Sequence, residues 1–122
     1  MADYENVIVV DFDNTICPFS EDFTCTGLVP GAAEGLARLK KAGYFVTISS
    51  ARNNVWYGGA AGEAYGLMVQ FLEGQSLLYD RLDTGCNGKP VGYAHIDDKG
   101  VGCPLTPEGW VDWYKVCDLL GV

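Results

Sequence analysis

The sequence predicts an α/β domain built on a parallel sheet, and two observations support this fold class. Residues 7 to 10 form an unbroken run of four β-branched side chains, which suits a strand covered on both faces. A helical segment and a second β-forming run at residues 44 to 48 follow, and the order strand, helix, strand implies a right-handed parallel crossover. With 122 residues the chain can bury one hydrophobic core, so we expect residues 1–122 to form a single domain.

The first predicted strand ends in two carboxylates, Asp11 and Asp13. Ligands of parallel α/β sheets bind at the carboxyl ends of the strands, so both acids are expected at a ligand-binding edge. Residues two apart on an extended chain point to opposite sides, and the two acids can face one point only if the chain turns at Phe12. Carboxylates gathered together favour a bound cation such as Mg2+ or acid–base chemistry; the simpler alternative is a pair of turn or capping acids.

The next elements repeat this pattern. Cys17 to Pro30 has little periodicity and is expected to form a flap over the strand ends. Residues 31 to 42 carry apolar side chains at helical spacing and are followed by Gly43, a typical helix stop. The strand at residues 44 to 48 then leads into Ser49-Ser50-Ala51-Arg52, so polar groups again follow a strand end.

The second half of the chain predicts two more helices and two short strands. A helix is expected from Asn53 or Asn54 to about Glu73, although Gly58, Gly62 and Gly66 fall four apart on it. Each glycine weakens a helix by about 1 kcal/mol relative to alanine, and we interpret the three as loose packing in preference to a dimer seam. Strands are predicted at residues 77 to 82 and 91 to 96.

The final helix is predicted to begin at Thr106-Pro107-Glu108. Threonine is a good cap, proline suits the first helical position and an acid suits the first turn. Trp110 and Trp113 are expected to pack on the core from one face of this helix.

Composition and charge narrow the classes of partner. The net charge of -8 disfavours a general nucleic-acid or anionic-membrane binder, and it leaves a local basic site possible. No apolar stretch approaches the roughly 20 residues of a membrane span, and the first residues lack the basic start of a signal peptide, so a cytoplasmic protein is expected. The five cysteines form no Cys-x-x-Cys pair and are expected to be reduced thiols.

The predicted strand ends supply a small set of polar side chains that a parallel sheet would gather in one place. A cation, a lysine, a hydroxyl and several carboxylates suit phosphoryl transfer, because the charge on three equatorial oxygens must be neutralised. Taken singly, each member has an ordinary explanation as a loop lysine, a capping serine or a turn acid. Their order along the chain favours a shared functional site over these separate explanations. The set consists of Asp11, Asp13, Ser50, Lys89, Asp97 and Asp98.

The segment Asp11-Phe12-Asp13-Asn14-Thr15 resembles the D-x-D-x-T motif of the haloacid dehalogenase-like (HAD) phosphatase superfamily. Ser50, Lys89 and Asp97-Asp98 fall where the second, third and fourth motifs of that superfamily belong. The resemblance spans roughly residues 6 to 99 and is greatest to the small capless members. It implies a three-layer, Rossmann-like HAD fold with a parallel central sheet, helices on both faces and no cap domain.

The resemblance also implies an activity and a role for each catalytic residue. It implies an Mg2+-dependent phosphatase that hydrolyses a phosphomonoester through an aspartyl-phosphate on Asp11. Asp13 would protonate the leaving oxygen and then deprotonate the hydrolytic water. Ser50 would donate a hydrogen bond to the phosphoryl group, and Lys89 would hold both that group and the Asp11 carboxylate.

The implied metal ligands come from both acidic segments. Mg2+ would bind the Asp11 carboxylate, the backbone carbonyl of Asp13 and the Asp97 carboxylate, with Asp98 as direct or water-mediated support. Hard oxygen donors of this kind suit Mg2+, and the remaining positions would be left for waters and a phosphate oxygen.

Thr15 and Arg52 complete the candidate site on the substrate side. Thr15 is expected to brace the loop that carries Asp13, whereas Arg52 fits either a contact with phosphate or substrate or a structural ion pair. His95 is expected to be a packing residue. A phosphorylated small molecule is the expected substrate, with the phosphorylated end group of a nucleic acid as the less favoured alternative. A homodimer is also compatible with the sequence.

Three alternatives use similar residues. One is a non-catalytic regulatory protein that binds Mg2+ and phosphate, and another is a phosphotransferase on the same site. The third is a response-regulator receiver domain, whose phosphorylated aspartate follows the third strand, where this chain offers Asp83. The order of the acids along the chain favours the HAD pattern over the receiver pattern.

Overall fold

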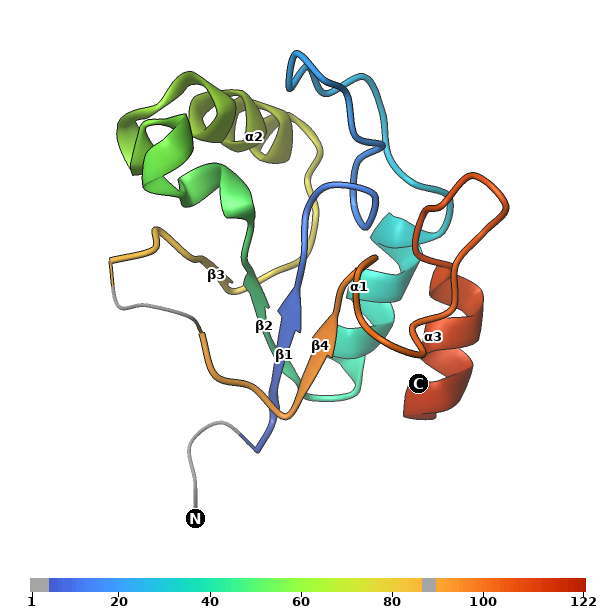
Figure 1. Ribbon diagram of the computed structural model, residues 1–122. Helices are drawn as coiled ribbons and strands as arrows, with labels where there is room; N and C mark the ends of the chain where they lie inside the picture. Colours follow the sequence, from blue (N-terminus) through green and yellow to red (C-terminus); the bar gives the residue numbers. More distant parts are fainter. Residues whose placement is uncertain (1–4, 87–89) are drawn as a thin grey trace.

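A four-stranded parallel sheet forms the centre of the molecule, and helices flank it (Figure 1). The computed structural model describes residues 5–86 and 90–122. The strand order is β3-β2-β1-β4, and the strands are β1 (Val7–Val10), β2 (Phe45–Ile48), β3 (Arg81–Leu82) and β4 (Ala94–Ile96). All three pairings are parallel, so the strands end at one common edge. The predicted α/β class is confirmed.

Three α-helices and three short 3-10 turns connect the strands. The helices are α1 (Ala32–Lys41), α2 (Glu63–Gly74) and α3 (Trp113–Leu120). The turns η1 (Ala51–Asn53), η2 (Val55–Tyr57) and η3 (Gly59–Ala61) lie between β2 and α2. Within residues 5–86 and 90–122 no cap domain is present, and no helix is long and apolar enough to cross a membrane.

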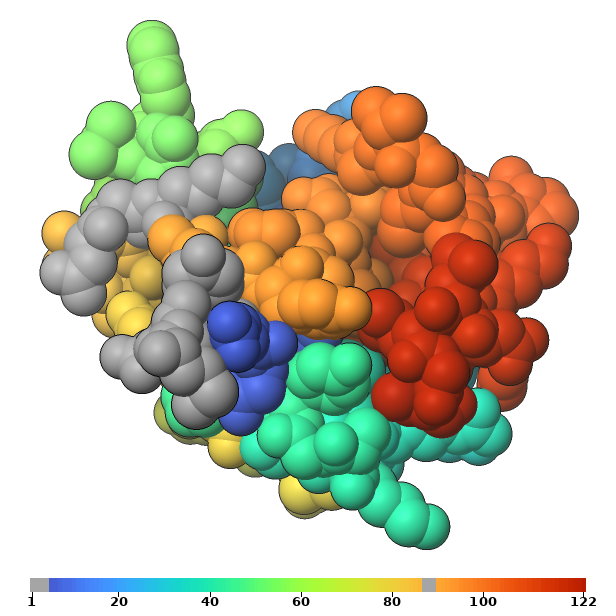
Figure 2. All heavy atoms as spheres, turned by 90° about the horizontal axis from the view of Figure 1, so that it is seen from below, coloured from blue at the N-terminus to red at the C-terminus, as the bar shows by residue number. Residues whose placement is uncertain are grey.

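The hydrophobic core lies between the helices and one face of the sheet. Ile8 and Val10 of β1 are fully buried on this face, as are Val46 and Ile48 of β2. The α1 and α3 helices pack side by side, which is visible from the end where the strands begin (Figure 2). A β-carbon added to Gly35 of α1 would lie 2.3 Å from the Trp113 ring, so this contact leaves no room for a side chain.

The opposite face of the sheet carries Val9 and Thr47, which are also buried. The segment entering β4 packs here, because a β-carbon on Gly92 would lie 2.9 Å from a Val9 methyl group. His95 shares this face with Val9 but is exposed to solvent. The expectation that His95 is a packing residue is therefore wrong.

The predicted second helix begins about ten residues later than expected. Gly58 and Gly59 both take positive φ angles, of 88° and 64°, which an α-helix does not accommodate. Residues 51–61 consequently form the three 3-10 turns, and Asn54 caps η2 by accepting a hydrogen bond from the Trp56 amide. The three glycines do not form a stripe on one helix, because α2 begins only at Glu63.

The predicted final helix also begins later. Thr106-Pro107-Glu108-Gly109 forms a turn in which the Gly109 amide donates to the Thr106 carbonyl at 2.9 Å, so proline occupies a turn position. The helix starts at Trp113, where Asp112 caps it by accepting from the Lys115 amide. Trp113 is buried as expected, whereas Trp110 packs on the core from outside the helix. Strands β3 and β4 are shorter than predicted.

Candidate active site

Three carboxylates meet at the carboxyl edge of β1 and β4. The parallel register pairs Val10 with Ile96, and the Asp11 amide donates to the Ile96 carbonyl at 2.9 Å. This register brings Asp11 beside Asp97 and Asp98, and one oxygen of each carboxylate lies within 4.8 Å of the others. We refer to Asp11, Asp97 and Asp98 as the acidic edge.

The electrostatics of the acidic edge favour a bound cation. Burial, followed by the charge of Asp97, raises the pKa of Asp11 to about 8. Burial and a hydrogen bond with Asp97 also raise the pKa of Asp98. Three clustered carboxylates offer the hard oxygen donors that Mg2+ prefers, so these residues fit the cation that the sequence predicted.

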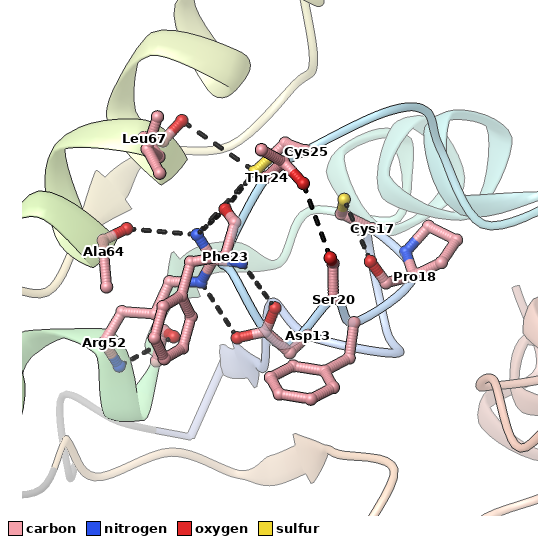
Figure 3. A network of polar contacts seen from close by, with 12 residues as sticks. Asp13, Cys17, Pro18, Ser20, Phe23, Thr24, Cys25, Arg52, Ala64 and Leu67 are labelled. Atoms are coloured by element: carbon pink, nitrogen blue, oxygen red, sulfur yellow. Dashed lines mark hydrogen bonds and ion pairs between the residues drawn. The ribbon is translucent and has the colours of Figure 1, made fainter.

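Asp13 forms an ion pair with the buried side chain of Arg52 (Figure 3). Arg52 Nε donates to Asp13 Oδ2 at 3.0 Å, and Nη2 donates to Oδ1 at 2.8 Å. The Arg52 side chain is 1% exposed, whereas that of Asp13 is 22% exposed and lines a cavity. The ion pair expected as one alternative for Arg52 is therefore present, and Arg52 also lines the cavity.

Arg52 also ties two other segments to this ion pair. Its Nη1 group donates to the Phe23 carbonyl of the flap and to the Ala64 carbonyl of α2, both at 3.0 Å (Figure 3). The guanidinium lies over the Phe12 ring at 5.0 Å and the Phe23 ring at 5.2 Å. Burial opposes its charge, but the hydrogen bonds and charge of Asp13 outweigh this effect and raise the pKa of Arg52. The guanidinium therefore stays charged.

The loop after β1 is braced from several directions. Thr15 is fully buried, and its Oγ1 donates to Asp11 Oδ2 at 3.4 Å. Asn14 takes a left-handed φ of 59°, donates to Asp98 at 3.4 Å and accepts from the Phe19 amide at 2.9 Å. Trp113 Nε1 donates to the Thr15 carbonyl at 2.7 Å. These bonds hold the two aspartates of the loop in place.

Two serines follow β2. Ser50 is buried, lines the cavity and caps η1 by accepting from the Arg52 amide at 3.1 Å. Ser49 lines the same cavity, and its amide donates to the Val10 carbonyl at 2.9 Å, so it lies beside Asp11 across the sheet. The sequence analysis missed Ser49, although its place directly after β2 was the signal that could have found it.

A cavity of about 420 Å3 connects these groups. The described part of the chain brings six sequence-predicted site residues to its lining: Asp11, Asp13, Ser50, Arg52, Asp97 and Asp98. Thr15 lies behind the lining, and Lys89 lies outside the described residues. Asp83, the acid that the receiver-domain alternative needs, is buried away from this lining and accepts from Asn53 at 3.3 Å.

The cavity also contains residues that the sequence analysis did not select. Three aromatic side chains line it, and no motif marked them: Phe19, Phe23 and Tyr57. The exposed side chain of Lys99 lines it as well.

Comparisons with known proteins give two similar structures. No family model and no curated protein matches the sequence. A conserved protein from Bacteroides thetaiotaomicron is 20% identical with a TM-score of 0.66, and the match covers 94% of this chain and 88% of that one. A D,D-heptose 1,7-bisphosphate phosphatase from B. bronchiseptica, complexed with magnesium and phosphate, is 18% identical with a TM-score of 0.45. That match covers 96% of this chain and 64% of the phosphatase chain.

The first of these likenesses shows that a known fold extends over 94% of this chain. The second is too distant to add to the fold assignment. A parallel α/β sheet with the D-x-D-x-T segment at the end of its first strand supports the HAD-like fold that the motifs predicted.

Proposed function

We propose that this protein is an Mg2+-dependent phosphatase that hydrolyses a phosphomonoester of a small molecule through an aspartyl-phosphate on Asp11. The observation that carries the proposal is the acidic edge. Its three carboxylates converge within 4.8 Å at the carboxyl ends of β1 and β4. Asp13 and Ser50 line the same cavity, so nucleophile, acid and hydroxyl donor have access to one substrate.

The acidic edge is proposed to hold Mg2+ through Asp11, Asp97 and Asp98, with the backbone carbonyl of Asp13 as a further ligand. When bound, Mg2+ would neutralise charge on the phosphoryl oxygens. Because the pKa of Asp11 is raised to about 8, ionisation of this carboxylate and cation binding are linked: each favours the other.

The proposed reaction has two chemical steps. Asp11 attacks phosphorus, the bond to the leaving oxygen breaks, and protonated Asp13 gives its proton to that oxygen. Water then attacks the aspartyl-phosphate, Asp13 takes a proton from the water, and phosphate leaves as Asp11 is regenerated. Ser50 or Ser49 donates a hydrogen bond to the phosphoryl group.

Arg52 and Lys89 have distinct proposed roles. Lys89 is proposed to hold the phosphoryl group and the Asp11 carboxylate, as the motif order implies. Arg52 is proposed to act as a positioning residue: it aims the Asp13 carboxylate, and one of its two bonds to Asp13 must open when Asp13 carries the proton.

The same ion pair favours one alternative. Because both Asp13 oxygens accept from Arg52, the site would also suit a protein that binds Mg2+ and phosphate without turnover. A phosphotransferase would use the same residues with an acceptor other than water.

The test is hydrolysis of p-nitrophenyl phosphate with and without Mg2+. We expect Mg2+-dependent phosphate release that Asp11→Asn abolishes, because this change keeps the shape and removes the nucleophile. Asp118→Asn, an exposed acid of α3, is the matched control and should keep full activity. Release that persists in Asp11→Asn, or that needs no cation, would reject the proposal. Tight Mg2+ binding without turnover would favour the binding protein.

A further inference from the structure

One wall of the cavity consists of aromatic rings, and the proposed chemistry gives these rings no role. Phe19 and Phe23 come from the flap and Tyr57 comes from η2; we refer to these three side chains as the aromatic wall. The Phe19 and Phe23 rings meet edge to face with centroids 6.1 Å apart, and those of Phe23 and Tyr57 at 5.1 Å. The wall thus joins two segments that lie far apart in the sequence.

The wall presents apolar surface to solvent at a place where a ligand would cover it. Phe19 is 49% exposed and Tyr57 is 46% exposed, although both line the same cavity as the acidic edge. Apolar surface left in water costs about 25 cal/mol per Å2, and neighbouring exposed rings at a concave site are typical of ligand contact.

The wall is held in place before any ligand arrives. Phe23 has a φ of 63°, a left-handed conformation that costs a non-glycine residue about 1 kcal/mol or more. Its ring lies 5.2 Å above the Arg52 guanidinium, and its carbonyl accepts from Arg52 Nη1 at 3.0 Å. Because Arg52 also pairs with Asp13, the ring and the proposed acid share one support.

The charges around the cavity restrict the group that the wall can receive. The acidic edge and Asp13 line the cavity, and the chain has a net charge of -8. Of the described basic side chains that line it, Arg52 is buried against Asp13, whereas Lys99 and His95 are exposed. A leaving group with a second phosphate would meet a negative field, whereas an uncharged ring can pack on the wall. A volume of about 420 Å3 suits a small ligand.

We propose that the aromatic wall binds the leaving group and that the substrate is a phosphomonoester of a small, uncharged aromatic alcohol or phenol. This inference rests on the proposed function. The ring packs on Phe19 and Tyr57 while the phosphoryl group faces Asp11. When Asp11 attacks phosphorus, the phosphorus–oxygen bond breaks, Asp13 protonates the oxygen, and the aromatic alcohol leaves along the wall.

The experiment compares phosphate esters whose leaving groups have similar acidity, because a phenol leaves readily whatever the wall contributes. Benzyl phosphate carries the ring, cyclohexylmethyl phosphate carries a bulky group of similar size, and glycerol 3-phosphate carries hydroxyls. We expect kcat/KM for benzyl phosphate to exceed both others by about 10-fold, the upper range for an aromatic contact. Equal values for the three esters would overturn the inference.

Substitutions in the aromatic wall test whether its rings contact the ring of the substrate. Phe19→Leu and Tyr57→Leu keep apolar bulk and remove the ring, and each should lower kcat/KM for benzyl phosphate about 3- to 10-fold without affecting glycerol 3-phosphate. Trp56→Leu is the matched control: Trp56 is 88% exposed in the same turn, lies outside the cavity lining and should leave both rates unchanged. Equal losses on both substrates would show a general structural effect and overturn the inference.

Binding separates failure of the inference from failure of the proposed function. If no ester is turned over, p-nitrophenyl phosphate included, the proposed function fails, and calorimetry with Mg2+ then compares benzylphosphonate with methylphosphonate. Tighter binding of benzylphosphonate that Tyr57→Leu removes would keep the aromatic subsite, whereas equal binding would overturn it. Faster turnover of a phosphotyrosine peptide than of phenyl phosphate, whose leaving group is also a phenol, would overturn the assignment to a small molecule.

Discussion

The acidic edge and the flap form two sides of one cavity, yet different forces hold them. Main-chain hydrogen bonds of the sheet fix the acidic edge, since Asp11 and Asp97 directly follow paired residues of β1 and β4. The flap, residues 17 to 30, contains no helix or strand, and the Arg52 side chain binds its Phe23 carbonyl. The carboxylates therefore depend on backbone register. Main-chain hydrogen bonds of Cys17 and Val29 anchor the two ends of the flap, whereas its middle depends on side-chain contacts such as that of Arg52.

The largest expected effect is on the acidic edge. We expect Asp97→Asn to lower kcat/KM on p-nitrophenyl phosphate about 1,000-fold at low Mg2+, because a metal-ion contact contributes several kcal/mol. The Mg2+ concentration for half-maximal rate should rise, while the far-ultraviolet circular dichroism should stay unchanged because the register of β4 is kept. An unchanged Mg2+ requirement would remove Asp97 from the metal site.

The next largest effect concerns the contact that unites the two regions. Arg52→Ala should lower the free energy of unfolding by about 3 kcal/mol, because it leaves Asp13 without its partner and frees the Phe23 and Ala64 carbonyls. Denaturant titration measures this loss, and limited proteolysis should show faster cleavage in the flap.

A surface ion pair supplies the matched control for that variant. Arg38 pairs with Glu34 on α1 at 3.0 Å, with both side chains about half exposed, so Arg38→Ala should cost less than about 1 kcal/mol. Equal losses in Arg38→Ala and Arg52→Ala would contradict the special role of Arg52.

The stability of the cation-free protein should fall as pH rises. Below about pH 4 Asp11 is protonated in both the folded and the unfolded chain; between pH 4 and 8 only the folded chain keeps that proton, so its contribution to stability is lost as pH approaches 8. We expect the Tm in chelator to drop by about 10 °C between pH 5 and pH 8.5. Mg2+ should restore it at the higher pH.

Asp11→Asn tests the source of this pH dependence. Asparagine does not ionise, so the variant should show a flatter Tm profile over the same range. A cation-free wild-type protein that became more stable from pH 5 to pH 8.5 would contradict the sign derived from the raised pKa of Asp11.

The smallest effect is expected at the exposed tip of the flap. Ser20 donates to Asp22 at 2.6 Å, and Thr24 donates to both side chains, so these hydrogen bonds stay within the flap. Ser20→Ala should therefore shift the Tm by about 2 °C or less, and it should leave hydrolysis of p-nitrophenyl phosphate unchanged. A large loss of stability would show that the flap has an organisation of its own beyond the Arg52 contact.

The sequence predicted the part of the site that local patterns determine. The buried run at residues 7 to 10 defined β1, and helical spacing followed by Gly43 defined α1 to within one residue at each end. Parallel strand ends then placed Asp11, Ser50 and Asp97 at one cavity. The carry-over of individual roles to these residues stays a prediction.

Long-range contacts determine what the sequence could not predict. The pairing of Arg52 with Asp13 and Ala64 depends on how η1 and α2 fold back over the flap, which no spacing reveals. The second and third helices begin later along the chain than predicted. Several glycines and the proline that were placed inside these helices lie in turns that precede them. Positive φ angles at Gly58 and Gly109 belong to turns that tertiary contacts select.

The hydrogen bond from Trp113 to the Thr15 carbonyl makes this indole an intrinsic fluorescence probe of the loop after β1. Of the three indoles, Trp113 is 1% exposed and bonded to the loop that carries Asp11 and Asp13, the proposed catalytic aspartates, whereas Trp56 is 88% exposed. A Trp56→Phe variant would therefore shift the emission spectrum toward that of shielded indoles. Changes in its fluorescence on addition of Mg2+ would follow the loop directly, without a label and on the timescale of mixing.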